Sequence, residues 1–120
     1  MFNKKVLLIH PSSKAVYEGF ERKDINRIPI GLAYIAATAE SNGYDTKVVD
    51  AEVENLSLQE LGSYVNEFGP SIVGVTCTTP LFPITSKILD IVKEISNSTI
   101  TIIGGPHINA LPGDSLTECN

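Results

Sequence analysis

The chain has 120 residues, 42% of them hydrophobic, and a formal net charge of −5 at pH 7, as expected for one globular domain and not for a disordered or fibrous chain. Its nine lysines and arginines form no basic cluster, which argues against a nucleic-acid partner. The two cysteines, Cys77 and Cys119, have no partner at metal-ligand spacing, so neither a zinc site nor a disulfide framework is indicated. The first apolar run, Val6–Ile9, is far shorter than a signal peptide or a membrane span, so we expect a cytoplasmic protein.

The first predicted element is a lysine-led apolar strand over Lys5–Ile9, which His10 and Pro11 end because proline cannot donate to a strand ladder. Residues 12–28 carry many charges without a clear period. Such a long connection is uncommon inside a compact domain. We therefore expect these residues to form a mobile loop, which lies over the ligand-binding edge of the sheet.

The rest of the chain alternates helix and strand, with proline, serine or glycine at the predicted boundaries. The predicted helices run from Pro29 to about Asn42, from Ser57 to Phe68, and from Leu81 or Pro83 to Ser96, and the predicted strands cover Asp45–Val49, Ser71–Val75 and Thr99–Ile103. The first of these helices is apolar over a wide arc, and its small alanines predict close approach to the sheet. Residues 111–120 carry only a weak helical pattern.

This alternation predicts an α/β fold: a Rossmann-like, doubly wound parallel sheet, because parallel neighbours need crossover connections. We expect the flavodoxin-like order, in which the first strand lies between the second and the third and the switch point falls between strands one and three. Residues 1–120 would form one domain, a fragment of a larger protein truncated before its last strand. The exposed edge would then favour pairing with a second copy.

The carboxyl ends of parallel strands meet at one edge, where open α/β sheets bind ligands. Gly104 and Gly105 lack a Cβ and let a bulky group approach the backbone, although a plain tight turn explains them equally well. The hydroxyls of Thr76, Thr78 and Thr79 offer donors and acceptors to amides or a phosphate, with helix capping as the alternative.

Several chemistries are disfavoured by residues that are missing from this edge. No Gly-x-Gly-x-x-Gly follows the first strand, which argues against NAD or FAD, and no carboxylate ends the third strand, which argues against a receiver domain. Asp50, the carboxylate at a predicted strand end, is a typical loop cap, and Cys77 without a positioned base is a typical buried filler. His10 and His107 could meet as a metal pair, but no third ligand is visible, so we assign neither a metal site nor a catalytic residue.

Short motifs follow one another along nearly the whole chain: Pro29-Ile30-Gly31-Leu32-Ala33-Tyr34-Ile35-Ala36-Ala37, Gly43-Tyr44, Val49-Asp50-Ala51, Ile72-Val73-Gly74-Val75-Thr76 and Ile103-Gly104-Gly105-Pro106-His107. In this order and spacing the chain resembles the N-terminal cobalamin-binding domain of B12-dependent radical S-adenosylmethionine enzymes. That family includes the anaerobic magnesium-protoporphyrin monomethyl ester cyclase and many methyltransferases.

The resemblance implies that cobalamin lies across the carboxyl edge of the sheet. It also implies a following radical barrel, absent here, that carries a 4Fe-4S cluster on a Cys-x3-Cys-x2-Cys motif and uses S-adenosylmethionine. The residues that the motifs place toward cobalamin are Pro11, Ser12, Pro29, Ile30, Gly31, Asp50, Ala51, Thr76, Cys77, Thr78, Gly104, Gly105, Pro106 and His107.

Two departures limit what the resemblance implies. Cobalamin-dependent mutases and methionine synthase give cobalt a histidine from Asp-x-His-x-x-Gly, and neither His10 nor His107 has an aspartate two residues before it. The axial ligand would come from elsewhere, or there would be none. Because the cysteine triad is also missing, we do not expect this chain alone to catalyse. The alternatives are a flavodoxin-like interaction module without a cofactor and an enzyme that uses another small phosphorylated ligand at this edge.

Overall fold

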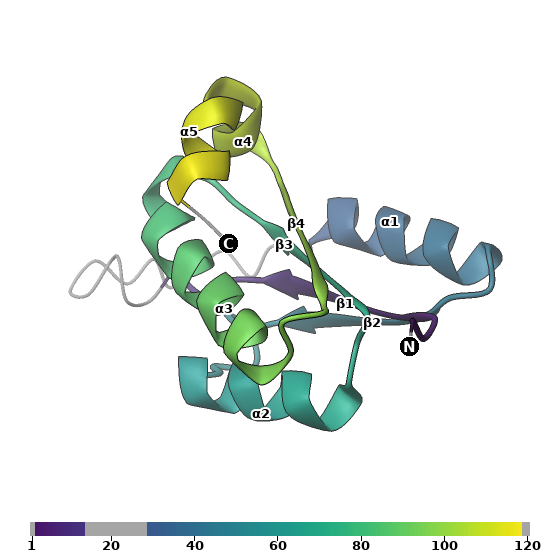
Figure 1. The fold of residues 1–120 in the computed structure, drawn as a ribbon. Helices are drawn as coiled ribbons and strands as arrows, with labels where there is room; N and C mark the ends of the chain where they lie inside the picture. Colours follow the sequence, from purple (N-terminus) through teal and green to yellow (C-terminus); the bar gives the residue numbers. More distant parts are fainter. Residues whose placement is uncertain (1, 14–28, 119–120) are drawn as a thin grey trace.

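Four parallel strands form the centre of the structure, a computed structural model that describes residues 2–13 and 29–118. They are β1 (Lys5–His10), β2 (Asp45–Asp50), β3 (Ile72–Thr76) and β4 (Ile100–Gly104), and their order in the sheet is β2-β1-β3-β4 (Figure 1). The predicted α/β class and flavodoxin-like order are confirmed. The loop expected over residues 12–28 lies, from residue 14 on, outside the described residues.

Helices cover the two faces of the sheet unequally. Helix α1 (Ile30–Ser41) lies on one face, and α2 (Leu58–Phe68) and α3 (Phe82–Ile95) cover the other (Figure 1). A short 3-10 turn, η1 (Thr79–Leu81), leads into α3, and two short helices, α4 (Pro106–Ala110) and α5 (Pro112–Glu118), follow β4. Within the described ranges no helix has the length and apolarity needed to cross a membrane.

Side-chain alternation along β1 divides the core into two parts. Leu7 and Ile9 are fully buried in the larger cluster with residues of α2 and α3, whereas Val6 and Leu8 pack with Leu32 and Ala36 of α1. Strand β1 therefore faces an apolar layer on each side, because successive side chains point to opposite faces.

The ends of α2 follow the sequence signals. The Ser57 hydroxyl accepts a hydrogen bond from the Glu60 backbone N–H at 3.1 Å, so the serine predicted at this boundary caps the helix. Gly69 ends the helix in the left-handed region, with φ of 64°.

The structure corrects the prediction for α1. Its wide apolar arc was expected to pack on the sheet, but only Leu32 and Ala36 are buried, and the side chains of Tyr34 and Ile35 are 73% and 55% exposed. The reason is that α1 lies over β1 and β2, and no other described helix covers β3 and β4 on that face. Ile102 of β4 is accordingly 53% exposed.

The segment after β4 is helical. Pro106 begins α4, where a missing N–H costs nothing. The weak helical pattern of residues 111–120 corresponds to α5, which ends at Glu118.

We expect Thr85→Val to raise the free energy of unfolding by about 1 kcal/mol, because a buried unpaired hydroxyl costs about 1–3 kcal/mol. Thr85 of α3 is fully buried, and its hydroxyl has no hydrogen-bond partner among the described residues. Urea unfolding measures the change. Thr38→Val, on an exposed turn of α1, is the matched control and should change the stability by less than about 0.5 kcal/mol. A loss of stability in Thr85→Val would contradict the assignment.

Candidate functional site

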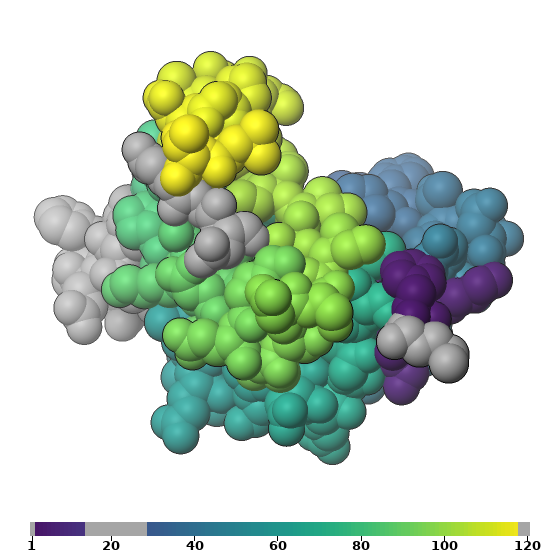
Figure 2. All heavy atoms as spheres, viewed as in Figure 1, coloured from purple at the N-terminus to yellow at the C-terminus, as the bar shows by residue number. Residues whose placement is uncertain are grey.

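A groove of about 890 Å³ opens on the face of the sheet that α1 covers only in part. Its floor consists of side chains from β1, β3 and β4 that alternate onto that face, and one helical stripe of α1 forms its wall. In Figure 2 the surface is hollowed between α1 and the C-terminal helices. This volume falls within the usual range of pockets that bind cofactors and drug-sized molecules.

The body of the groove is apolar, and polar side chains line it at the carboxyl edge of the sheet and, from Thr38 and Asn42, toward the end of α1. Leu8, Ile35, Ile72 and Ile102 line its body, away from the carboxyl edge of the sheet. At the carboxyl edge the lining changes to His10, Thr76 and Thr78. Such a site matches an amphipathic ligand whose polar part lies at the strand ends.

Two of the glycines at the groove leave space free. A Cβ atom added to Gly31 or Gly104 would meet no other atom within 4 Å, so the backbone there is open to a ligand. Gly31 lies in the first turn of α1 and Gly104 at the end of β4, on opposite sides of the groove.

Gly105 serves the fold in a different way. Its φ is 112°, and a Cβ there would lie 2.6 Å from the Cys77 carbonyl oxygen. This close approach joins the exits of β3 and β4: the Cys77 N–H donates to the Gly104 carbonyl at 2.8 Å, and the His107 N–H donates to the Cys77 carbonyl at 3.3 Å. Only glycine adopts this conformation without strain.

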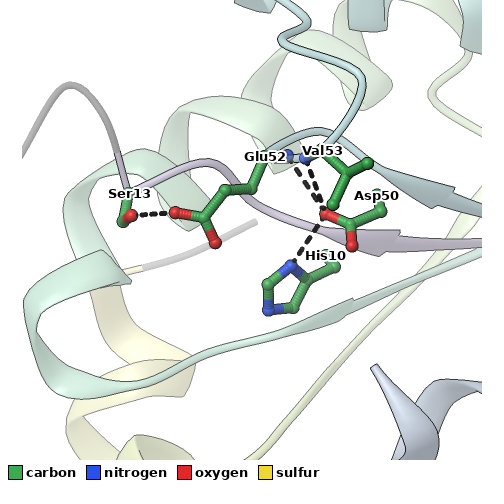
Figure 3. Close-up of polar contacts among 5 residues, drawn as sticks. All are labelled: His10, Ser13, Asp50, Glu52 and Val53. Atoms are coloured by element: carbon green, nitrogen blue, oxygen red, sulfur yellow. Dashed lines mark hydrogen bonds and ion pairs between the residues drawn. The ribbon is translucent and has the colours of Figure 1, made fainter. Parts of the chain in front are cut away.

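A polar pair lies where β1 and β2 end. His10 and Asp50 are register partners, and the His10 Nδ1 lies 3.2 Å from the Asp50 Oδ1 (Figure 3). The same oxygen accepts hydrogen bonds from the backbone N–H groups of Glu52 at 3.1 Å and Val53 at 3.2 Å. Ser13 donates to the Glu52 carboxylate, which ties the loop after β1 to the loop after β2.

The structure gathers about half of the residues predicted from the motifs around the groove. Those that line it are Pro29, Gly31, Thr76, Thr78, Gly104 and Gly105. Asp50 adjoins it through its contact with His10. These positions lie on β2, β3, β4 and the start of α1, whose ends meet at one edge as predicted.

Other predicted residues lie away from the groove. Ala51 and Cys77 are buried in the interior, at 0% and 1% exposure. His107 is also buried, stacked on Phe82 with ring centroids 4.3 Å apart and with its Nδ1 3.2 Å from the Thr79 hydroxyl. Pro11 is fully buried, Ser12 is half-buried, and Ile30 and Pro106 are exposed without lining the groove. Among the described residues no group of three or more His, Cys, Asp or Glu side chains could hold a metal ion.

Several groove residues were not singled out from the sequence. His10 was considered only as half of a metal pair, although it shares one face of β1 with Val6 and Leu8 by simple alternation. The α1 stripe was missed in the same way. Apart from Gly31, its members were not predicted, although they recur at helical spacing: Tyr34, Ile35, Thr38 and Asn42.

Comparison with known proteins identifies relatives of this domain. Residues 27–119 match the family described as the B12 binding domain. An uncharacterized methyltransferase of Pyrococcus horikoshii is 29% identical over 121 residues, which cover 96% of this chain and 24% of the relative. The anaerobic magnesium-protoporphyrin IX monomethyl ester cyclase of Rubrivivax gelatinosus is 33% identical over 104 residues, which cover 86% of this chain and 18% of that protein. The chain thus spans about a quarter or less of these relatives.

The fold also matches a solved structure. The radical S-adenosylmethionine methyltransferase TsrM from Kitasatospora setae, with cobalamin and a 4Fe-4S cluster bound, superposes with a TM-score of 0.76 at 20% sequence identity. The match covers 98% of this chain and 22% of TsrM. At this level of identity the likeness shows a shared fold.

Substitutions at Gly104, the last residue of β4, and at Gly105, the residue after it, should differ in their effect on stability. Gly105→Ala should lower the free energy of unfolding by more than about 1 kcal/mol, because alanine at this φ is strained and its Cβ overlaps the Cys77 carbonyl. Gly104→Ala, which meets open space, should change it by less than about 0.5 kcal/mol. Thermal and urea unfolding of both variants check the pair, and equal effects would contradict the distinction.

Proposed function

Because the chain belongs to the B12-binding domain family, we propose that it binds cobalamin in the groove on the α1 face, as one module of a longer radical S-adenosylmethionine enzyme. The observation that carries the proposal is the groove itself. It is apolar along its body, polar at the carboxyl edge, and lined on both sides by glycines that leave the backbone open.

These features suit the chemistry of cobalamin. The cofactor is a wide, flat macrocycle with amide arms and a long nucleotide tail. The hydroxyls of Thr76 and Thr78 offer hydrogen-bonding groups for amides or the phosphate, and the apolar body of the groove offers burial to the rest. Gly104 lets the ligand approach the end of β4 closely.

The proposed role of this chain is to bind and orient the cofactor. When bound, cobalamin supplies a cobalt centre that can carry a methyl group. The groove residues hold the ligand, and the apolar side chains of α1 and β4 exclude water from part of it. We do not assign a catalytic residue to this chain.

The activity of the whole protein is a further part of the proposal. We propose that residues 1–120 are the cobalamin-binding domain of a parent with a radical S-adenosylmethionine domain and a 4Fe-4S cluster. The names of the relatives, methyltransferases and a tetrapyrrole cyclase, support methyl transfer or anaerobic oxidative cyclisation as its reaction. A cytoplasmic location, the absence of a nucleic-acid partner and pairing through the edge of β4 stay predictions.

Titration of the purified chain with hydroxocobalamin tests the binding proposal. We expect the visible spectrum of the cofactor to change and its colour to co-migrate with the protein on gel filtration. If the folded wild-type chain produces neither effect, cobalamin binding is rejected, and an interaction module without a cofactor becomes the better interpretation.

A bulky side chain at position 104 tests whether the cofactor binds in the groove. Gly104→Leu places a side chain into the open groove, and we expect it to weaken cobalamin binding at least tenfold, which is about 1.4 kcal/mol. Gly113→Leu is the matched control, because that glycine also meets open space but lies on α5 and does not line the groove. Equal affinity of the two variants would place the cofactor elsewhere.

A further inference from the structure

Thr78 presents its hydroxyl to the groove from the short connection between β3 and η1. Its side chain is exposed and lines the polar end of the groove. Although Thr78 is the N-cap residue of η1, its side chain makes no capping hydrogen bond, so helix capping does not account for it. The position of this hydroxyl therefore depends on the residues on either side, Cys77 and Thr79.

One residue contacts both of these neighbours. His107, in the first turn of α4, donates a hydrogen bond from its backbone N–H to the Cys77 carbonyl oxygen at 3.3 Å. Its ring Nδ1 lies 3.2 Å from the Thr79 hydroxyl oxygen, within hydrogen-bonding distance. The two contacts fall on the residues directly before and after Thr78. His107 thus holds the connection on both sides of the groove hydroxyl.

The imidazole of His107 is itself held by packing. The residue is only 6% exposed, and its ring stacks on Phe82, the first residue of α3, with ring centroids 4.3 Å apart. Close packing against an aromatic ring keeps the imidazole in one orientation, with its Nδ1 toward Thr79. The contact with Thr79 therefore ties the connection after β3 to a rigid part of the core.

We infer that His107 is a positioning residue for cofactor binding: it holds the connection that presents Thr78 to the groove and does not touch the ligand itself. The inference rests on the proposed cobalamin binding. Thr76, the other threonine of the groove, lies within the strand ladder as the register partner of Gly104, so its position does not depend on the His107 ring. The two threonines should therefore respond differently when the ring is changed.

Two variants of the full chain, titrated with hydroxocobalamin, separate the hydrogen bond of the ring from its packing. His107→Phe keeps an aromatic ring against Phe82 and removes the nitrogen, whereas His107→Asn keeps a polar atom near the place of Nδ1 and removes the ring. We expect the first to weaken binding about fivefold, as for the loss of one hydrogen bond, and the second less than about twofold. Urea unfolding of both variants should show the opposite order, because His107→Asn leaves a cavity in the core.

Thr79→Val removes the same hydrogen bond from its other end and shows whether it acts through Thr78. Thr79 is exposed and does not line the groove, so we expect this variant to fold and to bind hydroxocobalamin about fivefold more weakly. In a Thr78→Val background this loss should disappear, because the hydroxyl that the contact positions is already absent. In a Thr76→Val background, the matched control from the same edge, the loss should remain.

Other results overturn the inference. Wild-type affinity in Thr79→Val would mean that the contact does not position the groove hydroxyl, and this variant decides the matter if His107→Phe does not fold. A loss that persists undiminished in the Thr78→Val background would mean that the contact acts elsewhere. Weaker binding by His107→Asn than by His107→Phe would leave His107 only a packing role. In these cases the wild-type chain binds cobalamin and the proposed function stands. If the wild-type chain binds none, both proposals fall.

Discussion

The parallel pairing of β1 with both β2 and β3 is the constraint on which the rest of the structure depends. The register joins Lys5 to Asp45 and His10 to Asp50 on one side, and Val6 to Ile72 and Ile9 to Val75 on the other. Because side chains alternate along a strand, this register decides at once which residues enter each core and which ones reach the groove. A shift of one residue would turn His10 away from Asp50 and Leu7 out of the larger cluster.

Because helices cover the two faces unequally, this register leaves an apolar groove on the α1 face of the sheet. On one face α2 and α3 bury Leu7, Ile9 and Val73 completely. On the other face α1 packs on Val6 and Leu8, and the body of the groove beside it is apolar. Exposed apolar surface of this kind is unfavourable in water, and it is typical of surfaces that bind a partner or a ligand.

The two adjacent glycines at the carboxyl edge of the sheet look alike in the sequence but have different roles in the structure. Gly104 leaves the backbone open, whereas Gly105 lets the exits of β3 and β4 pack within hydrogen-bonding distance. Two adjacent residues at the end of β3 also differ in their position. Thr76 lines the groove, while Cys77, one residue later, is buried in the interior.

The sequence by itself determined the α/β class, the order of strands and helices, the serine cap at Ser57 and the edge at which the motifs meet. These features rest on local signals: apolar periodicity, caps, and glycine or proline at boundaries. The motifs were also sufficient to indicate the family to which residues 27–119 belong. Half of the predicted site residues lie at the groove because strand ends in a parallel sheet share one edge.

Only the tertiary structure decided which residues beyond the strand ends line the groove and which ones enter the core. Past its last ladder bond a residue has no alternating face, so the burial of Ala51, Cys77 and His107 depends on packing between distant segments. The His10 and Asp50 pair is decided in the same way, because its partners lie 40 residues apart and meet only through the register of β1 and β2. The exposure of apolar side chains on α1 likewise depends on which elements cover the neighbouring strands. No local pattern within the helix can specify that cover.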